Sequence, residues 1–196
     1  EIVNEPHYAG GSHFFGTAAE LAEMHWRART TILAIDPTAK IYSSGMDGAL
    51  NNYARTFLRG VDPTSSKKGY ETIDAFNLHI YHGSVTKSLT TDIDNAIDTM
   101  KLQLAAVGVP NMPFAITEWG ISGAIDAEVT AWLALTAAQR KTGLMRRMMI
   151  GAARGAQNFF CYSHSATHGG NFQTDTDGVI SAMTDIHNQV AGKTIS

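Results

Sequence analysis

Residues 75–81 read Ala75-Phe76-Asn77-Leu78-His79-Ile80-Tyr81, and this stretch decides the fold class. It is short and largely apolar, so it predicts a strand. A helical stretch follows at residues 93–107, and a second short apolar run follows at residues 114–116. A strand, a helix and another strand in this order are typical of the βα units that build a parallel sheet.

The same alternation extends over the rest of the chain and predicts an α/β fold. The predicted strands are residues 1–3, 40–43, 75–81, 114–116 and 158–162. The predicted helices are residues 18–35, 53–58, 93–107, 127–153 (broken near Gly143) and 179–190. The first helix begins at a capping box, since Thr17 stands three residues before Glu20.

Five βα units suit either an arc of a barrel or a doubly wound sheet of five strands. A doubly wound sheet usually carries a glycine-rich phosphate-binding turn after its first strand. Gly10-Gly11 lies near that place, but the residues around it contain no GxGxxG pattern. The usual marker of a doubly wound sheet is therefore not convincingly present.

Composition narrows the functional classes. Of the 196 residues, 44% are hydrophobic and 17% are charged, as expected for one globular domain with a core. The formal charge of −3 argues against nucleic acid or an anionic membrane as a partner, because phosphate binding needs a basic surface. The single cysteine excludes an internal disulfide. No stretch approaches the roughly 20 apolar residues of a membrane span.

Two carboxylates fall at the carboxyl ends of predicted strands. Glu5 follows residues 1–3, and Glu118 follows residues 114–116. In a closed parallel barrel these strand ends converge on one face, where active sites are built. A pair of carboxyls about 5 to 5.5 Å apart can cleave a glycosidic bond with retention, one attacking the anomeric carbon and the other protonating the leaving oxygen.

Three motifs carry a resemblance to known enzymes. Ile2-Val3-Asn4-Glu5-Pro6-His7 resembles the fourth-strand Asn-Glu-Pro signature of the retaining glycosidases with TIM-barrel folds. Phe114-Ala115-Ile116-Thr117-Glu118-Trp119-Gly120 resembles their seventh-strand nucleophile motif. Between them, Phe76-Asn77-Leu78-His79-Ile80-Tyr81-His82 is similar to the sixth-strand His-x-Tyr of glycoside hydrolase families 5 and 39. The three motifs occur in the expected order, which makes the joint signal much stronger than any one of them.

The resemblance implies a partial (β/α)8 barrel, with strands four to eight and their helices forming one catalytic domain over residues 1–196. It also implies that Glu5 is the general acid/base and Glu118 the nucleophile. The substrates would be β-linked polysaccharides or oligosaccharides. The first three βα units of such a barrel are missing, and we expect the chain to be part of an enzyme of roughly 300 to 400 residues. An extracellular or periplasmic location suits a polysaccharide-degrading parent enzyme.

Four further residues are implied to bind substrate or support the carboxylates. Asn4 would hydrogen-bond the sugar 2-hydroxyl, and Tyr81 would donate to Glu118. His79 would support that network or touch the substrate; a satisfied polar core group is the alternative. Trp119 would offer a flat apolar face to the sugar; packing under a loop is the alternative.

We expect no cofactor and no metal. His164 and His168, with Asp175 and Asp177 nearby, could hold a cation in the loop after the last strand, but the same loop is where sugar subsites would lie. Two other functions remain open from the sequence. One is a carbohydrate-binding relative without catalysis. The other is a complete five-stranded α/β ligand-binding module, in which Glu5 and Glu118 would lie far apart.

Overall fold

The structure is a computed structural model that describes residues 1–6, 14–47, 52–82, 91–121, 130, 134–161 and 184. Its helices and strands alternate along the chain as the sequence predicts. In order they are α1 (Ala18–Ile35), β1 (Met46–Asp47), α2 (Asn52–Arg59), the 3-10 turn η1 (Gly69–Thr72), β2 (Phe76–His82), α3 (Thr91–Ala106), β3 (Phe114–Ile121), α5 (Ala137–Ala153) and β4 (Ala156–Cys161). The predicted helix at residues 179–190 lies outside the described residues, apart from Thr184.

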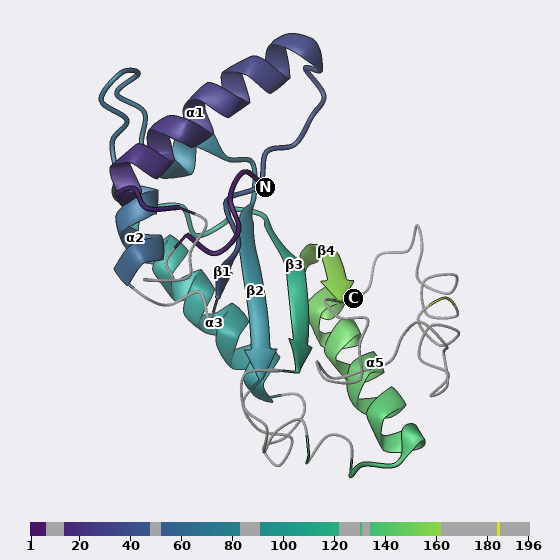
Figure 1. The fold of residues 1–196 in the computed structure, drawn as a ribbon. Helices are drawn as coiled ribbons and strands as arrows, with labels where there is room; N and C mark the ends of the chain where they lie inside the picture. The colour runs from purple at the N-terminus through teal and green to yellow at the C-terminus, as the bar shows by residue number, and fades with distance from the viewer. Residues whose placement is uncertain are drawn as a thin grey trace.

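The four strands form one parallel sheet in the order β1-β2-β3-β4. Each strand therefore lies beside the next one in the chain, with helices α3 and α5 packed along the sheet (Figure 1). A doubly wound sheet reverses its strand order at a switch point. The described strands show no such reversal, so the α/β prediction is confirmed in its singly wound form.

The sheet is strongly curved, which follows from a contact between its two edges. The side-chain amide of Asn158 on β4 donates a hydrogen bond to the hydroxyl of Tyr42, which lies just before β1. Neighbouring strands are spaced by about 4.8 Å, so the edges of a flat four-stranded sheet would be roughly 14 Å apart. Two side chains of this length reach each other only if the sheet bends toward them. Tyr42 pairs with Ala75 just before β2, which fixes the face that becomes concave.

The hydrophobic core lies on the other, convex face. Alternate residues of β2 contribute to it, together with Phe114, Ile116 and Trp119 of β3. Helices α3 and α5 pack against the sheet, and α1 and α2 add buried apolar residues to the same core, so the helices are amphipathic as predicted. The fully buried residues of α3 are Ile93 and Ile97, with Met100 and Leu104 almost fully buried.

Helix α1 begins where the sequence predicts. The Thr17 hydroxyl accepts from the Glu20 amide at 3.2 Å, and the Glu20 carboxylate accepts from the Thr17 amide at 2.6 Å, which completes the capping box. Further along the helix, the buried His25 ring accepts a hydrogen bond from the amide of Ser44 at 3.3 Å. This contact ties α1 to the chain that enters β1. No helix among the described residues has the length and apolar character needed to cross a membrane.

Several predicted element boundaries are wrong, among them the start of the helix predicted over residues 127–153, because residues 134–136 are not helical and α5 begins at Ala137. Residues 1–3 form no strand, because the Glu1 side chain, rather than the backbone, bonds to the sheet. In place of a strand at residues 40–43 there is a single bridge at Tyr42, and regular pairing begins only at β1. Helix α5 continues through the buried Gly143, since packing outweighs the cost of about 1 kcal/mol for a helical glycine. Strand β3 continues past residue 116, so Glu118 lies within it.

Candidate active site

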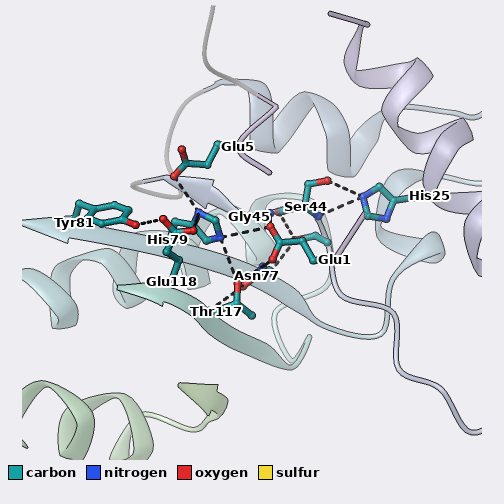
Figure 2. Close-up of polar contacts among 11 residues, drawn as sticks. Glu1, Glu5, His25, Ser44, Gly45, Asn77, His79, Tyr81, Thr117 and Glu118 are labelled. Carbon is teal, nitrogen blue, oxygen red and sulfur yellow. Dashed lines mark hydrogen bonds and ion pairs between the residues drawn. The ribbon is translucent and has the colours of Figure 1, made fainter. Parts of the chain in front are cut away.

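The concave face of β2 presents three polar side chains in a row. Asn77, His79 and Tyr81 are two residues apart, so the alternation of a strand directs them to the same side. His79 is almost completely buried, with 1% of its side chain exposed. Figure 2 shows these three residues beside Glu1, Glu5 and Glu118 from other segments. Strand β2 therefore forms the floor of the candidate site.

A bulge in β3 brings Glu118 to the same face. Leu78 pairs with Ile116 and His79 pairs with Glu118, so Thr117 is an extra residue between two paired ones. A bulge of this kind re-aims the side chains that follow it, and bulges are frequent next to active sites. Both Thr117 and Glu118 consequently contact side chains of the concave face.

The same bulge corrects the predicted role of Trp119. Trp119 pairs with Ile80, whose side chain lies in the core, and Trp119 is itself fully buried there. A fully buried ring cannot offer its face to a sugar. The structure therefore gives Trp119 a packing position, which is the alternative that the sequence left open.

Glu5 and Glu118 meet at His79. The Nδ1 atom of His79 lies 3.0 Å from Glu5 Oε1 and 3.5 Å from Glu118 Oε2. The facing carboxylate oxygens and this nitrogen all lie within 4.8 Å of one another (Figure 2). Both carboxylates keep 19% of their side-chain surface exposed, so they are partly buried but still reached by solvent. A complete five-stranded ligand-binding module would place these two glutamates far apart. In the structure they lie close together.

Tyr81 supports Glu118 from the other side. Its hydroxyl donates a hydrogen bond to Glu118 Oε1, while His79 faces Oε2. Hydrogen bonds and a nearby positive charge both favour the ionised form of a carboxylate. The contact between Tyr81 and Glu118 is the one predicted from the sequence, although what the pair does in a reaction stays a prediction.

The backbone at Glu5 is held in an uncommon conformation. Its φ angle is +41°, in the left-handed region that non-glycine residues rarely occupy. The buried Pro6 follows it, and the exposed Asn4 precedes it. Strain of this kind persists only where the surroundings fix it, and it gathers at functional sites. It turns the Glu5 side chain toward His79 and leaves the Asn4 side chain in solvent beside it.

His79 is charged under ordinary conditions. Burial lowers the pKa of the ring, but hydrogen bonds to Glu1 and Glu5 and the charges of Glu118 and Glu1 outweigh burial and raise the pKa to about 9. His79, Glu5 and Glu118 are also close enough for a cation to bridge them. A protonated ring has no lone pair to offer a metal.

The sequence did not predict that further residues contact His79 on the side away from Glu5 and Glu118. Glu1, Gly45, Asn77 and Thr117 surround the Nε2 side of the ring (Figure 2). Glu1 was assigned to a strand, and Asn77 and Thr117 entered only as parts of motifs. The regular two-residue spacing of Asn77, His79 and Tyr81 was the available signal for Asn77.

Gly45 has no room for a side chain because His79 fills the space. A Cβ atom at this position would lie 2.0 Å from Nε2 of the His79 ring. We expect Gly45→Ala to lower the free energy of unfolding by about 1 to 3 kcal/mol, the usual cost of overpacking. Urea denaturation measures this loss.

A double-mutant cycle provides the control for Gly45→Ala. In a His79→Ala background the ring is gone, so the same glycine substitution should cost little. An equal loss in both backgrounds would show that the clash with His79 is not the cause.

Several predicted site residues lie outside the described part of the chain. They are the candidate cation or subsite residues of the last loop, His164, His168, Asp175 and Asp177. Their roles stay predictions.

The fold is similar to that of two solved glycosidase structures. One is a glucosidase from Croceicoccus marinus, with a TM-score of 0.63 and 19% identity over 90% of this chain and 35% of that one. The other is a monomeric beta-xylosidase from Caulobacter crescentus, with a TM-score of 0.59 and 18% identity over 84% of this chain and 33% of that one. The chain thus spans about a third of the length of each, and at this identity the similarity establishes the fold.

No protein-family model matches the sequence. A search of curated proteins also found no match.

Proposed function

We propose that the chain carries the catalytic pair of a retaining glycoside hydrolase, with Glu5 as the acid/base and Glu118 as the nucleophile. One observation supports the proposal above all: the facing oxygens of the two carboxylates lie within 4.8 Å of each other. Retaining enzymes hold their carboxyl groups about 5 to 5.5 Å apart, whereas inverting enzymes need about 6.5 to 9.5 Å to admit a water.

The sheet fits an arc of a (β/α)8 barrel whose interior is the concave face. Its strands are parallel and in chain order, as barrel closure requires. The contact between Tyr42 and Asn158 bends the sheet toward the face that carries His79. The proposed site then lies where the loops after barrel strands are expected to converge.

The reaction would proceed by two displacements. In the first, the Glu118 carboxylate attacks the anomeric carbon while Glu5 gives its proton to the leaving oxygen. His79 bonds to Oε1 of Glu5, which leaves Oε2 to carry that proton. In the second, Glu5 takes a proton from water, which attacks the anomeric carbon and releases Glu118. Asn4, exposed beside Glu5, would bond the sugar 2-hydroxyl.

The substrates we propose are β-linked oligosaccharides or polysaccharides. The matched structures are a glucosidase and a beta-xylosidase, so aryl β-glucosides and aryl β-xylosides are suitable first probes. The test follows the product by proton NMR during the first minutes of hydrolysis. The β anomer should form first and then mutarotate, because two displacements restore the starting configuration. Initial formation of the α anomer would rule out the retaining mechanism, and a purified protein that bound but never cleaved these glycosides would point to the non-catalytic relative.

A further inference from the structure

The carboxylate of Glu1 lies against three segments of the sheet at once. The amide of Gly45, just before β1, donates to Oε1 at 3.1 Å. The side-chain amide of Asn77 on β2 and the hydroxyl of Thr117 on β3 lie 3.1 and 3.2 Å from Oε2. Burial would raise the pKa of Glu1, but the hydrogen bond and charge of His79, together with the contacts from Gly45 and Thr117, hold it below its usual value. Glu1 is therefore a fixed negative charge, four residues before Glu5.

That charge lies on the far side of His79 from the two catalytic glutamates. The Nε2 atom of the ring is 3.5 Å from Glu1 Oε1 and 3.3 Å from the hydroxyl oxygen of Thr117. The Thr117 hydroxyl lies 2.7 Å from Asn77 Oδ1, a shorter contact than that with Glu1, so it donates there and its oxygen can accept from Nε2. Nδ1 faces Glu5 and Glu118. Each ring nitrogen thus faces acceptors, which suits a ring protonated at both positions.

The ring is also confined sterically. Gly45 leaves no space beside Nε2, and the side chain is almost completely buried. A rotation of the ring would remove Nδ1 from both carboxylates. Gly45, Thr117 and Glu1, on the Nε2 side of the ring, therefore help to fix the orientation of His79. The catalytic glutamates on the Nδ1 side do not fix it alone.

We propose that Glu1 is a positioning residue that holds His79 as an oriented cation between Glu5 and Glu118. This inference rests on the proposed function for its catalytic meaning, because it concerns the same pair of carboxylates. The cation screens two carboxylates that would otherwise repel each other. Glu1 acts through His79, since its own oxygens are occupied by the sheet.

The charged groups around His79 determine the sign of the pH effect. The N-terminal segment contributes Glu1 and Glu5, β3 contributes Glu118, and β2 contributes Tyr81, which bonds to Glu118. The chain before β1 contributes Ser44 and Gly45, which carry no charge. Among the described residues, all the ionised groups that face His79 are acidic, so each of them stabilises the protonated ring. Removing Glu1 should lower the pKa of His79, and the cation should be lost at a lower pH.

The test is Glu1→Gln, which removes the charge but keeps nearly the same shape. The readout is the imidazole NMR signal of His79, identified with a His79→Gln variant, as pH is raised from 5 to 10. We expect the midpoint to fall from about 9 by about 1 to 3 units, the usual effect of one opposite charge in contact. The alkaline limb of kcat/KM should move by the same amount. Glu23→Gln, which removes a partly buried carboxylate of α1 paired with Arg27, is the matched control and should change neither.

The outcomes separate this inference from the proposed function. A His79 midpoint that stays unchanged in folded Glu1→Gln would overturn the positioning role, even if Glu118→Gln abolished activity. A shifted midpoint in a protein that cleaves no glycoside would uphold the role of Glu1 and refute the glycosidase. If Glu1→Gln does not fold, the wild-type ring decides the matter. A neutral His79 at pH 7, read from its two nitrogen shifts, would overturn the inference.

Discussion

Glu118→Gln should reduce kcat/KM for an aryl β-glycoside by more than about a hundredfold, since one nucleophile of this kind commonly accounts for three or more orders of magnitude. The amide has almost the same shape as the carboxylate, and its oxygen can still accept from Tyr81. It has no charge, however, and cannot form a stable glycosyl ester. The loss should therefore lie in the chemical step, with folding preserved. Steady-state kinetics with a nitrophenyl β-glucoside or β-xyloside measures it.

Two further variants sharpen the assignment of Glu118. Glu23→Gln, on α1, controls for the loss of a carboxylate elsewhere and should keep full activity. Glu118→Ala, supplied with azide, should regain turnover and release the α-glycosyl azide, because azide then enters from the side that the nucleophile has vacated. Residual activity above about one hundredth of wild type in Glu118→Gln would contradict the nucleophile role.

The part of the candidate site that could be predicted is the part that follows from the motifs and from the common direction of the strands. Glu5, His79 and Glu118 lie in motifs on separate segments, and the rule that parallel strands end on one face indicates that they meet. The distances within 4.8 Å agree with that expectation. The contact of Tyr81 with Glu118 follows from the same motifs. The residue types in the three motifs and the order of the motifs along the chain were therefore enough to predict that these side chains lie together.

The directions of these side chains and the contacts around them could not be predicted from the sequence, because they depend on how the strands pair. The bulge at Thr117 appears only when β2 and β3 are in register, and it decides that Glu118 faces the site and Trp119 the core. Gly45 is one glycine among many in the sequence, and only the position of His79 explains it. Glu1 looked like a strand residue because Ile2 and Val3 follow it, yet its side chain accepts hydrogen bonds from Gly45 and Asn77.

The fold shows the same division between local and tertiary signals. The capping box at Thr17 is local, so the start of α1 was predicted to the residue. Gly143 was expected to break a helix on its intrinsic propensity, but burial against the sheet keeps α5 continuous. The ends of strands were predicted less well than the start of α1, since a strand ends where its pairing with the neighbouring strand ends. This matters for function, because the predicted end of β3 placed Glu118 outside the strand that positions it.

Glu5→Ala should affect substrates according to their leaving groups. A dinitrophenolate departs without protonation, so kcat/KM for its glycoside should fall only slightly. A sugar leaving group needs the proton of Glu5, and general acid catalysis is worth about 10² to 10⁴ in rate, so kcat/KM for an oligosaccharide should fall by that factor. The measurement is kcat/KM over a series of aryl β-glycosides and one β-linked disaccharide.

The second displacement gives an independent check on the same residue. Without Glu5 no base activates water, so the glycosyl ester on Glu118 should accumulate, and both kcat and KM should fall on reactive substrates. Azide needs no base, and here it attacks the ester from the opposite face to that used in Glu118→Ala. It should therefore release the β-glycosyl azide. Two variants of carboxylates that lie within 4.8 Å would then give azides of opposite configuration, which only a nucleophile and an acid/base on opposite faces of the sugar can produce. Equal losses on all leaving groups, or the same azide from both variants, would remove Glu5 from the acid/base role.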